Sequence, residues 1–307
     1  MSDREPTALI VADTTVDPIV RFLADESTGP AIAARVAPLG QVRQVLGNAA
    51  HAAWSPPADL LVVWTAPERA IPSFANLLEH APADLARILD EVDAFSQAVA
   101  GAVDRAAHTY VVSWSLPPHH RWVRSLAWRH ETGLANVLAR MNLRLAENLR
   151  ATGAVLLDSG GWYAACEAPP FDAKMHALGK IRYSREMFRI AAAEIRTVTA
   201  GRLGLSRKLI VCDLDNTLWG GVIGDDGLEG IALGGVDPIG ESHQDMQRAL
   251  KILRRRGVLL AICSRNDEAV ALDAIDRHTE MILRRDDFAA WRINWQDKAT
   301  NLAEMVA

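Results

Sequence analysis

LIVCDLDNT, residues 209–217, joins an apolar run directly to two aspartates, Asp213 and Asp215. The uninterrupted apolar residues predict a strand that is buried on both faces, as in a parallel sheet. Ligands bind parallel α/β sheets outside the carboxyl ends of the strands, and Asp213 stands at such an end. The two-residue step to Asp215 can bring both carboxylates to one side of the chain. The segment therefore predicts an α/β domain with an acidic site at the edge of its sheet.

This pair of carboxylates suits covalent phosphoryl transfer. Two carboxylates this close repel each other, so that one tends to keep a proton, whereas a bound divalent cation keeps the nucleophile ionised. Asp213 would attack phosphorus and form an aspartyl-phosphate. Asp215 would protonate the leaving group and then activate water. We expect Mg²⁺ to bind the Asp213 carboxylate, the Asp215 backbone carbonyl and a phosphate oxygen.

Two later positions strengthen this interpretation, because an Asp-x-Asp pair alone is also typical of an acidic turn. Ser264 ends the next predicted strand and precedes Arg265 and Asn266, where a helix is expected to begin. A hydroxyl beside free helix N–H groups can bind phosphate, or it can simply cap the helix. Lys298 opens the last predicted helix. A cation there would neutralise Asp213 and the phosphate in the transition state, although a lone lysine is usually a surface residue.

Strand-like and helix-like segments alternate on both sides of this site, as judged from apolar runs and from apolar residues at three- and four-residue spacing. After residue 205 we expect strands at Leu209–Asp213, Val258–Cys263 and 281–283, and helices at His243–Arg256, Glu268–Arg277 and Gln296–Val306. Before it we expect strands at Ala8–Ala12, Leu60–Trp64, Thr109–Trp114 and Ala154–Asp158, and helices at Phe74–Val103 and Leu134–Leu149. The alternation predicts two doubly wound parallel-sheet domains, over residues 1–183 and 205–307, joined by a helical connector at 184–204.

The composition argues against several classes of protein. The 307 residues carry a formal net charge of −5, which gives no electrostatic footprint for nucleic acid. No apolar run reaches the roughly 18 residues that a membrane helix needs, so we expect no membrane partner. The start, MSDREPTALI, has acids where a signal peptide has a basic region. Three widely spaced cysteines suggest no disulfide framework, and we expect a reduced, cytoplasmic protein.

The order of DLDNT, a serine at a strand end and a lysine resembles the haloacid dehalogenase (HAD) superfamily. Two longer stretches, Asp213–Ile231 and Ala261–Asp267, resemble one branch of it, the FkbH-like proteins of polyketide assembly lines. The resemblance continues upstream through WSLPPHHR, GLANVLARMNLRLAE and GKIRYS, and so covers nearly the whole chain. It implies a Mg²⁺-dependent enzyme that takes D-1,3-bisphosphoglycerate, removes phosphate and loads the glyceryl unit as a thioester on an acyl carrier protein.

The resemblance also implies roles for the residues around the two aspartates. HAD proteins place a cap or flap after the nucleophile, which screens the aspartyl-phosphate from water. Glycines allow the backbone to turn close to a ligand, although an ordinary hairpin is the alternative. The residues expected to contact substrate or phosphate are Thr217, Trp219, Gly220, Gly221, Ser264, Arg265 and Asn266.

A departure from the HAD pattern concerns the metal. HAD enzymes carry a further acidic motif after the lysine helix, and the sequence ends at Ala307, shortly after Lys298. Asp286 and Asp287 precede Lys298 and do not fit that order. We therefore expect a HAD domain that lacks its C-terminal part, with an incomplete Mg²⁺ site.

The implied thioester chemistry is expected to pass through a cysteine. Cys263 adjoins Ser264 at the end of its strand, where a nearby cation or helix N-terminus could lower the pKa of its thiol. Cys212 adjoins Asp213 inside a strand, and Cys166 lies far from it in the sequence. Buried structural cysteine is the alternative for all three. Among them, Cys263 is our candidate for the acyl carrier.

The first domain resembles a flavodoxin-like SGNH hydrolase. That mechanism needs a serine just after the first strand, where this chain reads Ala12-Asp13-Thr14-Thr15, and an Asp-x-x-His motif, where Asp172 and His176 stand one residue too far apart. We therefore expect no esterase activity, and a role in closing over substrate or docking the carrier. Candidates to line its cleft, each more often packing or surface, are Trp114, His119, His120 and Asn136.

Two alternatives to the glyceryl transferase stay open. One is a HAD phosphatase of a small phosphoester without acyl transfer. The other is a catalytically weak module that binds a carrier protein, although a pure scaffold has no reason to crowd two acids at a strand end.

Overall fold

The computed structural model describes residues 4–26, 29–116, 124–235 and 237–306. The chain divides into two compact units, Met1–Gly204 and Leu205–Ala307, and each is described by itself.

The first unit is built on a five-stranded sheet whose strands are all parallel, in the order β2-β1-β3-β4-β5. This is the strand order of a flavodoxin-like doubly wound sheet. The predicted parallel α/β architecture is therefore confirmed for this unit, with one short strand that the sequence pattern missed, β2. The bounds are Thr7–Ala12 for β1, Ala33–Val36 for β2, Leu60–Trp64 for β3, His108–Val112 for β4 and Val155–Leu157 for β5.

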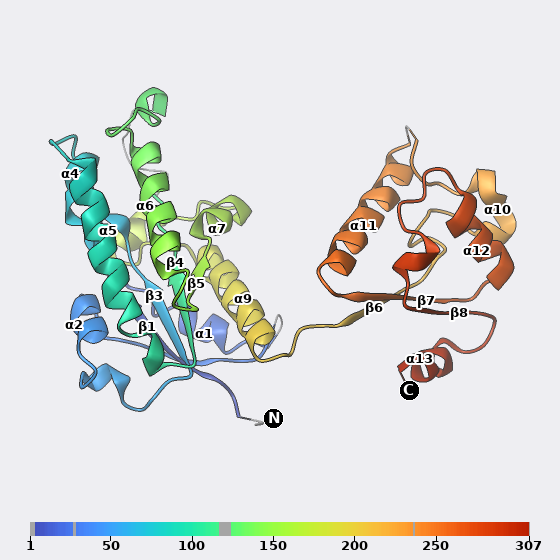
Figure 1. The fold of residues 1–307 in the computed structure, drawn as a ribbon, viewed down its shortest axis with the longest axis horizontal. Coiled ribbons are helices and arrows are strands. Elements are labelled where there is room, and N and C mark those ends of the chain that lie inside the picture. Colours follow the sequence, from blue (N-terminus) through green and yellow to red (C-terminus); the bar gives the residue numbers. More distant parts are fainter. Residues whose placement is uncertain (1–3, 27–28, 117–123, 236, 307) are drawn as a thin grey trace. The chain divides into compact units, whose positions relative to one another are not determined.

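Helices cover both faces of this sheet (Figure 1). Alternate residues of one strand point to opposite faces, so Leu61 and Val63 of β3 join one core and Leu60 and Val62 the other. The first core is closed by α2 (Val42–Gly47), α4 (Pro72–Leu78), α5 (Leu85–Ala100) and α6 (Leu134–Leu149). The second core is closed by α1 (Ile19–Leu23), α7 (Ser159–Ala165) and α9 (Arg185–Arg202).

Helix α9 is not a free connector. Its mixed charges predict a linker at residues 184–204, yet Met187, Phe188 and Ile195 are buried in the second core. Its apolar residues form one stripe, which packs on α1 and the sheet. Of its arginines, Arg196 is buried as well, whereas Arg185, Arg189 and Arg202 are exposed. The first unit therefore runs through this helix to Gly204.

The second unit has a three-stranded parallel sheet in the order β6-β7-β8. In Figure 1, α10, α11 and α12 lie on one side of this sheet and α13 on the other. The strands are β6 (Leu209–Cys212), β7 (Leu259–Ser264) and β8 (Ala290–Ile293), and the helices are α10 (Ile223–Gly230), α11 (Pro238–Arg255), α12 (Glu268–Arg277) and α13 (Lys298–Val306).

The third strand of this unit lies later than predicted. Residues 281–283 form no strand, because the backbone N–H groups of Ile282 and Leu283 donate to the side chain of Gln247 instead of to a neighbouring strand. Met281 and Leu283 are apolar because they fill the core, which the pattern cannot distinguish from a short strand.

In the part of the chain that the structure describes, no helix is both long and apolar enough to span a membrane.

Candidate active site

The carboxyl ends of β6 and β7 lie side by side, because these strands are parallel neighbours with Cys212 paired to Ile262. Asp213 follows β6 directly, and Ser264 is the last residue of β7. Lys298 begins α13, the helix after β8. Three residues that are far apart in the sequence thus meet at one edge of the sheet.

Asp213 is surrounded by three donors. Lys298 Nζ donates to Asp213 Oδ2 and forms an ion pair with it. The Leu214 backbone N–H donates to Oδ1 at 2.9 Å, and the Ser264 hydroxyl is a further donor. Burial raises the pKa of Asp213, but these donors together outweigh it and hold the pKa below its usual range. The side chain is still 38% exposed, so Asp213 is an ionised carboxylate that a substrate can reach.

Asp215 is fixed by a different set of donors. Its Oδ1 accepts hydrogen bonds from the Trp219 indole N–H at 2.9 Å and from the Ile223 backbone N–H at 3.1 Å. Its Oδ2 accepts one from Asn266 Nδ2 at 2.8 Å. Three donors hold the carboxylate in one orientation, and Oδ2, with a single donor, keeps a lone pair that can receive a proton.

Trp219 has a different position from the one predicted. It is fully buried, so it does not lie over a substrate, and its indole orients Asp215 instead. The turn between them is tight, because Asn216 has a left-handed φ of 54° and its Oδ1 accepts the Gly221 N–H at 3.0 Å. At Gly221, with φ of 93°, an added Cβ would lie 2.5 Å from Asp226 Oδ2. The conformation therefore requires glycine there.

The remaining residues of this turn face the protein rather than a ligand. The Thr217 carbonyl oxygen lies 2.9 Å from Nδ1 of His243, on α11. Gly220 exchanges two backbone hydrogen bonds with Ala232, and a Cβ on Gly220 would lie 3.2 Å from His243 Nε2. The segment predicted as a flap is thus folded onto its own unit and continues into α10, which is kinked at Gly227.

Of the residues predicted after β7, Ser264 and Asn266 contact the two aspartates, as described above. Arg265 does not. Its side chain is 57% exposed and lies 4.0 Å from Asp297, the residue before Lys298. Arg265 is therefore a cation close in sequence to the site, with its guanidinium available to an anion from solvent.

The structure does not bring Cys263 into the site. Its side chain is 4% exposed, and its Sγ lies 3.9 Å from the carbonyl oxygen of Lys298. Neighbouring residues of a strand point to opposite faces, and the next residue, Ser264, is the one that reaches the nucleophile. Cys212 is also buried, and burial raises the pKa of its thiol, as it does for the half-buried Cys166. Burial of this kind is typical of a packing cysteine.

The donor set fits a magnesium ion that keeps several waters. Proteins bind Mg²⁺ through one or two carboxylates, with waters and substrate phosphates completing the octahedron. Asp213 offers an accessible carboxylate, whereas the Asp215 carboxylate is engaged by N–H groups, so its backbone carbonyl would be the second ligand. Among the described residues, no group of three or more His, Cys, Asp or Glu side chains is arranged to hold a metal.

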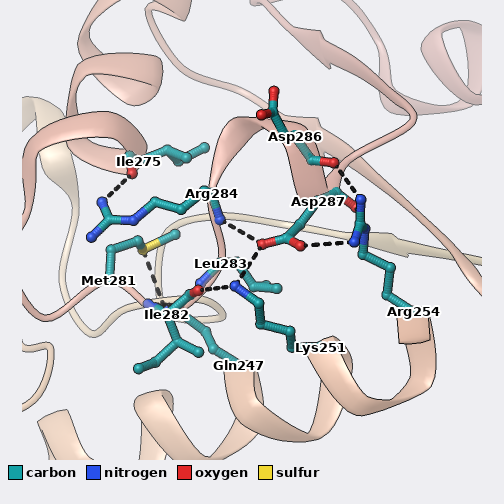
Figure 2. Close-up of polar contacts among 10 residues, drawn as sticks. All are labelled: Gln247, Lys251, Arg254, Ile275, Met281, Ile282, Leu283, Arg284, Asp286 and Asp287. Carbon is teal, nitrogen blue, oxygen red and sulfur yellow. Dashed lines mark hydrogen bonds and ion pairs between the residues drawn. The ribbon is translucent and has the colours of Figure 1, made fainter. Parts of the chain in front are cut away.

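A polar network connects α11 with the turn after Asp215 and with the loop that follows α12, and Figure 2 shows its contacts with that loop. The amide of Gln247, which is fully buried, donates from Nε2 to the Leu218 carbonyl at 2.7 Å. Its Oε1 accepts the N–H groups of Ile282 and Leu283 at 2.9 and 3.0 Å. One side chain therefore fixes both the turn that carries the aspartates and the loop that follows α12.

Asp287 belongs to the same network rather than to a metal site. It is buried, lies 3.1 Å from Lys251 and 3.3 Å from Arg254, and accepts the Arg284 N–H at 2.9 Å (Figure 2). The neighbouring Asp286 contributes its carbonyl to Arg254 at 2.7 Å. Both acids thus stabilise the loop before β8.

The sequence pattern did not single out Gln247 and His243. A signal for Gln247 was present, because Gln244 and Gln247 stand three residues apart on the apolar face of α11, ahead of Leu250. Buried polar side chains at helix spacing have to find hydrogen-bond partners, so such a pair predicts a buried network.

In the first unit, the predicted cleft residues that the structure describes contact other parts of the protein. Trp114 is buried, and its indole donates to Thr65 Oγ1 at 3.0 Å. Asn136 accepts a hydrogen bond from Arg140 at 2.9 Å. His119 and His120 lie outside the described residues.

Comparison with solved structures supports the fold over nearly the whole chain. The chain is similar to the N-terminal part of the protein BF1531 from Bacteroides fragilis, described as containing a phosphatase domain complexed with Mg. The TM-score is 0.83 at 22% sequence identity, and the match covers 98% of this chain and 80% of the other. At this identity, the likeness establishes the α/β fold and leaves the activity to be argued from the site.

Weaker likenesses involve acylhydrolases. For the lipase/acylhydrolase from Enterococcus faecalis, the TM-score is 0.41 at 11% identity, covering 65% of this chain and 97% of the other. For a GDSL-like lipase from Bacteroides thetaiotaomicron, the TM-score is 0.38 at 13% identity, covering 66% and 91%. No protein-family model and no curated protein matches the sequence.

Proposed function

We propose that the second unit transfers phosphoryl groups from a small phosphorylated substrate, through an aspartyl-phosphate on Asp213 and with Mg²⁺. The observation that carries the proposal is the accessible, ionised Asp213 between Lys298 and Ser264, two residues before the rigidly held Asp215. The likeness to a structure described as a Mg-bound phosphatase domain supports the same reading.

Each residue of the site has a separate role in the proposed reaction. Asp213 Oδ1 or Oδ2 forms a bond to phosphorus while the bond from phosphorus to the leaving oxygen breaks. Lys298 and the Ser264 hydroxyl stabilise the charge on the transferring group. Asp215 Oδ2 gives a proton to the leaving oxygen and then takes one from the water that hydrolyses the aspartyl-phosphate. When bound, Mg²⁺ supplies charge neutralisation at the phosphate oxygens.

Release of inorganic phosphate from a generic aryl phosphate tests this assignment. We expect Asp213→Asn to lower the rate by about a thousandfold or more, the scale for loss of a nucleophile. A chelator should abolish the wild-type rate, and added Mg²⁺ should restore it. Asp286→Asn is the matched control, because it alters an exposed acid of the same unit whose side chain lies outside the site. Metal-independent turnover, or turnover that survives Asp213→Asn, would refute the mechanism.

The substrate is a finer proposal that rests on the resemblance of Asp213–Ile231 and Ala261–Asp267 to FkbH-like proteins. We propose D-1,3-bisphosphoglycerate as the substrate and an acyl carrier protein as the acceptor of the glyceryl unit. Intact-protein mass spectrometry with both partners present tests it. A glyceryl mass that reaches the phosphopantetheine arm of the carrier supports the transferase, and phosphate release without any acylated protein contradicts it.

The burial of Cys263 favours the alternative in which this unit is a phosphatase without an acyl-enzyme stage. Cys263→Ala separates the two cases. Loss of a glyceryl adduct on this chain, with phosphate release unchanged, would assign the acyl group to Cys263. An adduct of normal yield, or none in the wild type, would remove Cys263 from the reaction.

A further inference from the structure

A second polar cluster lies at the carboxyl edge of the sheet in the first unit. Most of the buried side-chain polar atoms that have no hydrogen-bond partner among the described residues belong to four residues, Thr14, Glu68, Tyr163 and Arg182. Thr14 follows β1, Glu68 is in α3 (Pro67–Ala70), Tyr163 is in α7, and Arg182 precedes α9. We call these four residues the Arg182 cluster. Ligands of doubly wound sheets bind at this edge.

Arg182 has a free binding edge although it is only 3% exposed. Its Nη1 donates to Glu68 Oε1 at 2.5 Å, while Nε and Nη2 have no partner. Nε–H and Nη2–H point the same way from one edge of the guanidinium plane, and this fork matches two oxygens of a carboxylate or phosphate. Buried charged donors without an acceptor are costly, so the free edge indicates that an acceptor binds there.

The neighbours of Arg182 extend this edge into a site. The hydroxyls of Thr14 and Tyr163 are buried without partners, and each can donate to an anion. Electrostatic interactions link Tyr163 with both Arg182 and Glu68. The same two residues interact electrostatically with Asp13, which precedes Thr14 in the chain, so Thr14 also lies in their neighbourhood.

Asp13 repels a bound anion less than an ordinary, ionised aspartate would. Its carboxyl oxygens accept the Ala66 N–H at 2.9 and 3.1 Å. Burial raises the pKa of Asp13 to about 7, with the Ala66 N–H and Arg69 acting against that rise. Near neutral pH, much of this group is uncharged.

Helix α8 (Ala173–Gly179) lies against the Arg182 cluster, since Gly179 accepts a hydrogen bond from Thr15 and His176 interacts with Arg182. No residue of α8 is buried, so this helix has few apolar contacts to resist local opening.

We propose that the Arg182 cluster binds a small oxyanion, a carboxylate or a phosphate, through the Nε/Nη2 edge of Arg182 and the hydroxyls of Tyr163 and Thr14. The site lies in the first unit and does not depend on the function proposed for the second unit. Because Asp13 stands where a nucleophilic serine would be needed, the site binds its ligand without acyl chemistry.

Isothermal titration of the full chain with inorganic phosphate, and separately with acetate, tests the proposal. We expect saturable millimolar or tighter binding of at least one of these anions, and the stronger one identifies the ligand class. Tyr163→Phe and Thr14→Val each remove one hydroxyl with almost no change in shape. Each should weaken binding by about tenfold, the scale of one hydrogen bond to a charged group. In anion-free buffer, neither variant should melt below the wild type, because the hydroxyl that is lost had no partner.

Two controls make the result specific. Thr109→Val also removes a buried hydroxyl without a partner, but on β4 and outside the cluster, so it should leave anion binding unchanged. Ser264→Ala weakens only phosphate that binds beside Asp213. Absence of saturable binding by either anion, or binding that Tyr163→Phe, Thr14→Val and Arg182→Lys all leave intact, overturns the proposal and means that the cluster holds water alone.

Discussion

Asp213 and Asp215 are two residues apart, yet their surroundings prepare them for different tasks. The donors on Asp213 include a lysine cation, and its carboxylate stays open to solvent. The donors on Asp215 are neutral N–H groups from three separate positions, one of them the buried indole of Trp219. The first arrangement suits a nucleophile and the second suits a group that holds a proton in a fixed place.

Trp219→Phe tests the positioning of Asp215, given the proposed phosphoryl transfer. The substitution keeps an aromatic ring in the core and removes the hydrogen bond to Asp215 Oδ1. We expect turnover to fall by about tenfold, because Asp215 loses one of the three donors that hold its carboxylate in a single orientation. Trp291→Phe is the control, since that indole contacts Glu268 at the surface. Turnover that Trp219→Phe leaves at the level of the Trp291→Phe control contradicts the role of Trp219.

Asp13 makes the stability of the first unit depend on pH. Its folded pKa of about 7 lies above the ordinary value of 3.8 because the group is buried. The contribution to stability is therefore fully present below the ordinary value and is lost as the pH rises through 7, by an amount on the order of 4 kcal/mol at most. Asp13→Asn should remove this slope in urea denaturation at several pH values, whereas exposed Asp84→Asn should keep it. Parallel slopes for wild type and Asp13→Asn would contradict the assignment.

For individual residues, the sequence was sufficient to predict that Asp213, Ser264 and Lys298 lie in one site. Their order along the chain carries the information, because parallel strands bring successive carboxyl ends to one edge. The sequence could not show that Trp219 and Cys263 are both buried. Those facts depend on which face of the sheet each helix covers, and adjacent strand residues with similar apolar neighbours do not reveal it.

At the scale of elements, α11 is the support of the site. Its buried face carries Gln247. The amide of this residue hydrogen-bonds to the Leu218 carbonyl and to the backbone N–H groups of Ile282 and Leu283, which would otherwise need main-chain partners. Helices with strong periodicity, such as Leu134–Leu149 and Glu268–Arg277, could be predicted to the residue. The long helix expected over Phe74–Val103 is interrupted, because His80 adopts a left-handed φ of 57° and Asp84 caps a new helix.

Gln247→Leu should destabilise the second unit by about 3 kcal/mol, because it leaves one carbonyl and two N–H groups buried without partners. Chemical denaturation followed by a probe in this unit measures the change. Arg255→Leu, at an exposed position of the same helix, should alter stability by less than about 0.5 kcal/mol. Equal effects of the two variants would show that the amide network contributes little.

At the scale of the whole molecule, two units with separate cores make up the chain. The alternation of strands and helices was enough to predict this division and its parallel sheets. It ended the first domain about twenty residues too early, because the mixed charges of α9 hid its buried stripe, whereas the predicted start of the second domain at residue 205 coincides with that of the second unit.

Separate cores predict separate responses to core substitutions. Leu145→Ala, in α6, and Leu260→Ala, in β7, each remove the same atoms from a fully buried site. Each should cost about 2–5 kcal/mol and lower the melting of its own unit only. Differential scanning calorimetry of the full chain resolves the transitions. A single transition that both variants shift equally would mean that the two units unfold as one.

The buried indole of Trp219 also gives the molecule a built-in spectroscopic reporter. Its N–H points at Oδ1 of Asp215, the carboxylate whose other oxygen, Oδ2, is expected to gain and lose a proton in each cycle. In a ¹H–¹⁵N spectrum, the indole signal that disappears in Trp219→Phe should lie downfield and exchange slowly with solvent. Its chemical shift should move when a phosphate analogue binds. The indole N–H of Trp219 would then report on the charge of the Asp215 carboxylate.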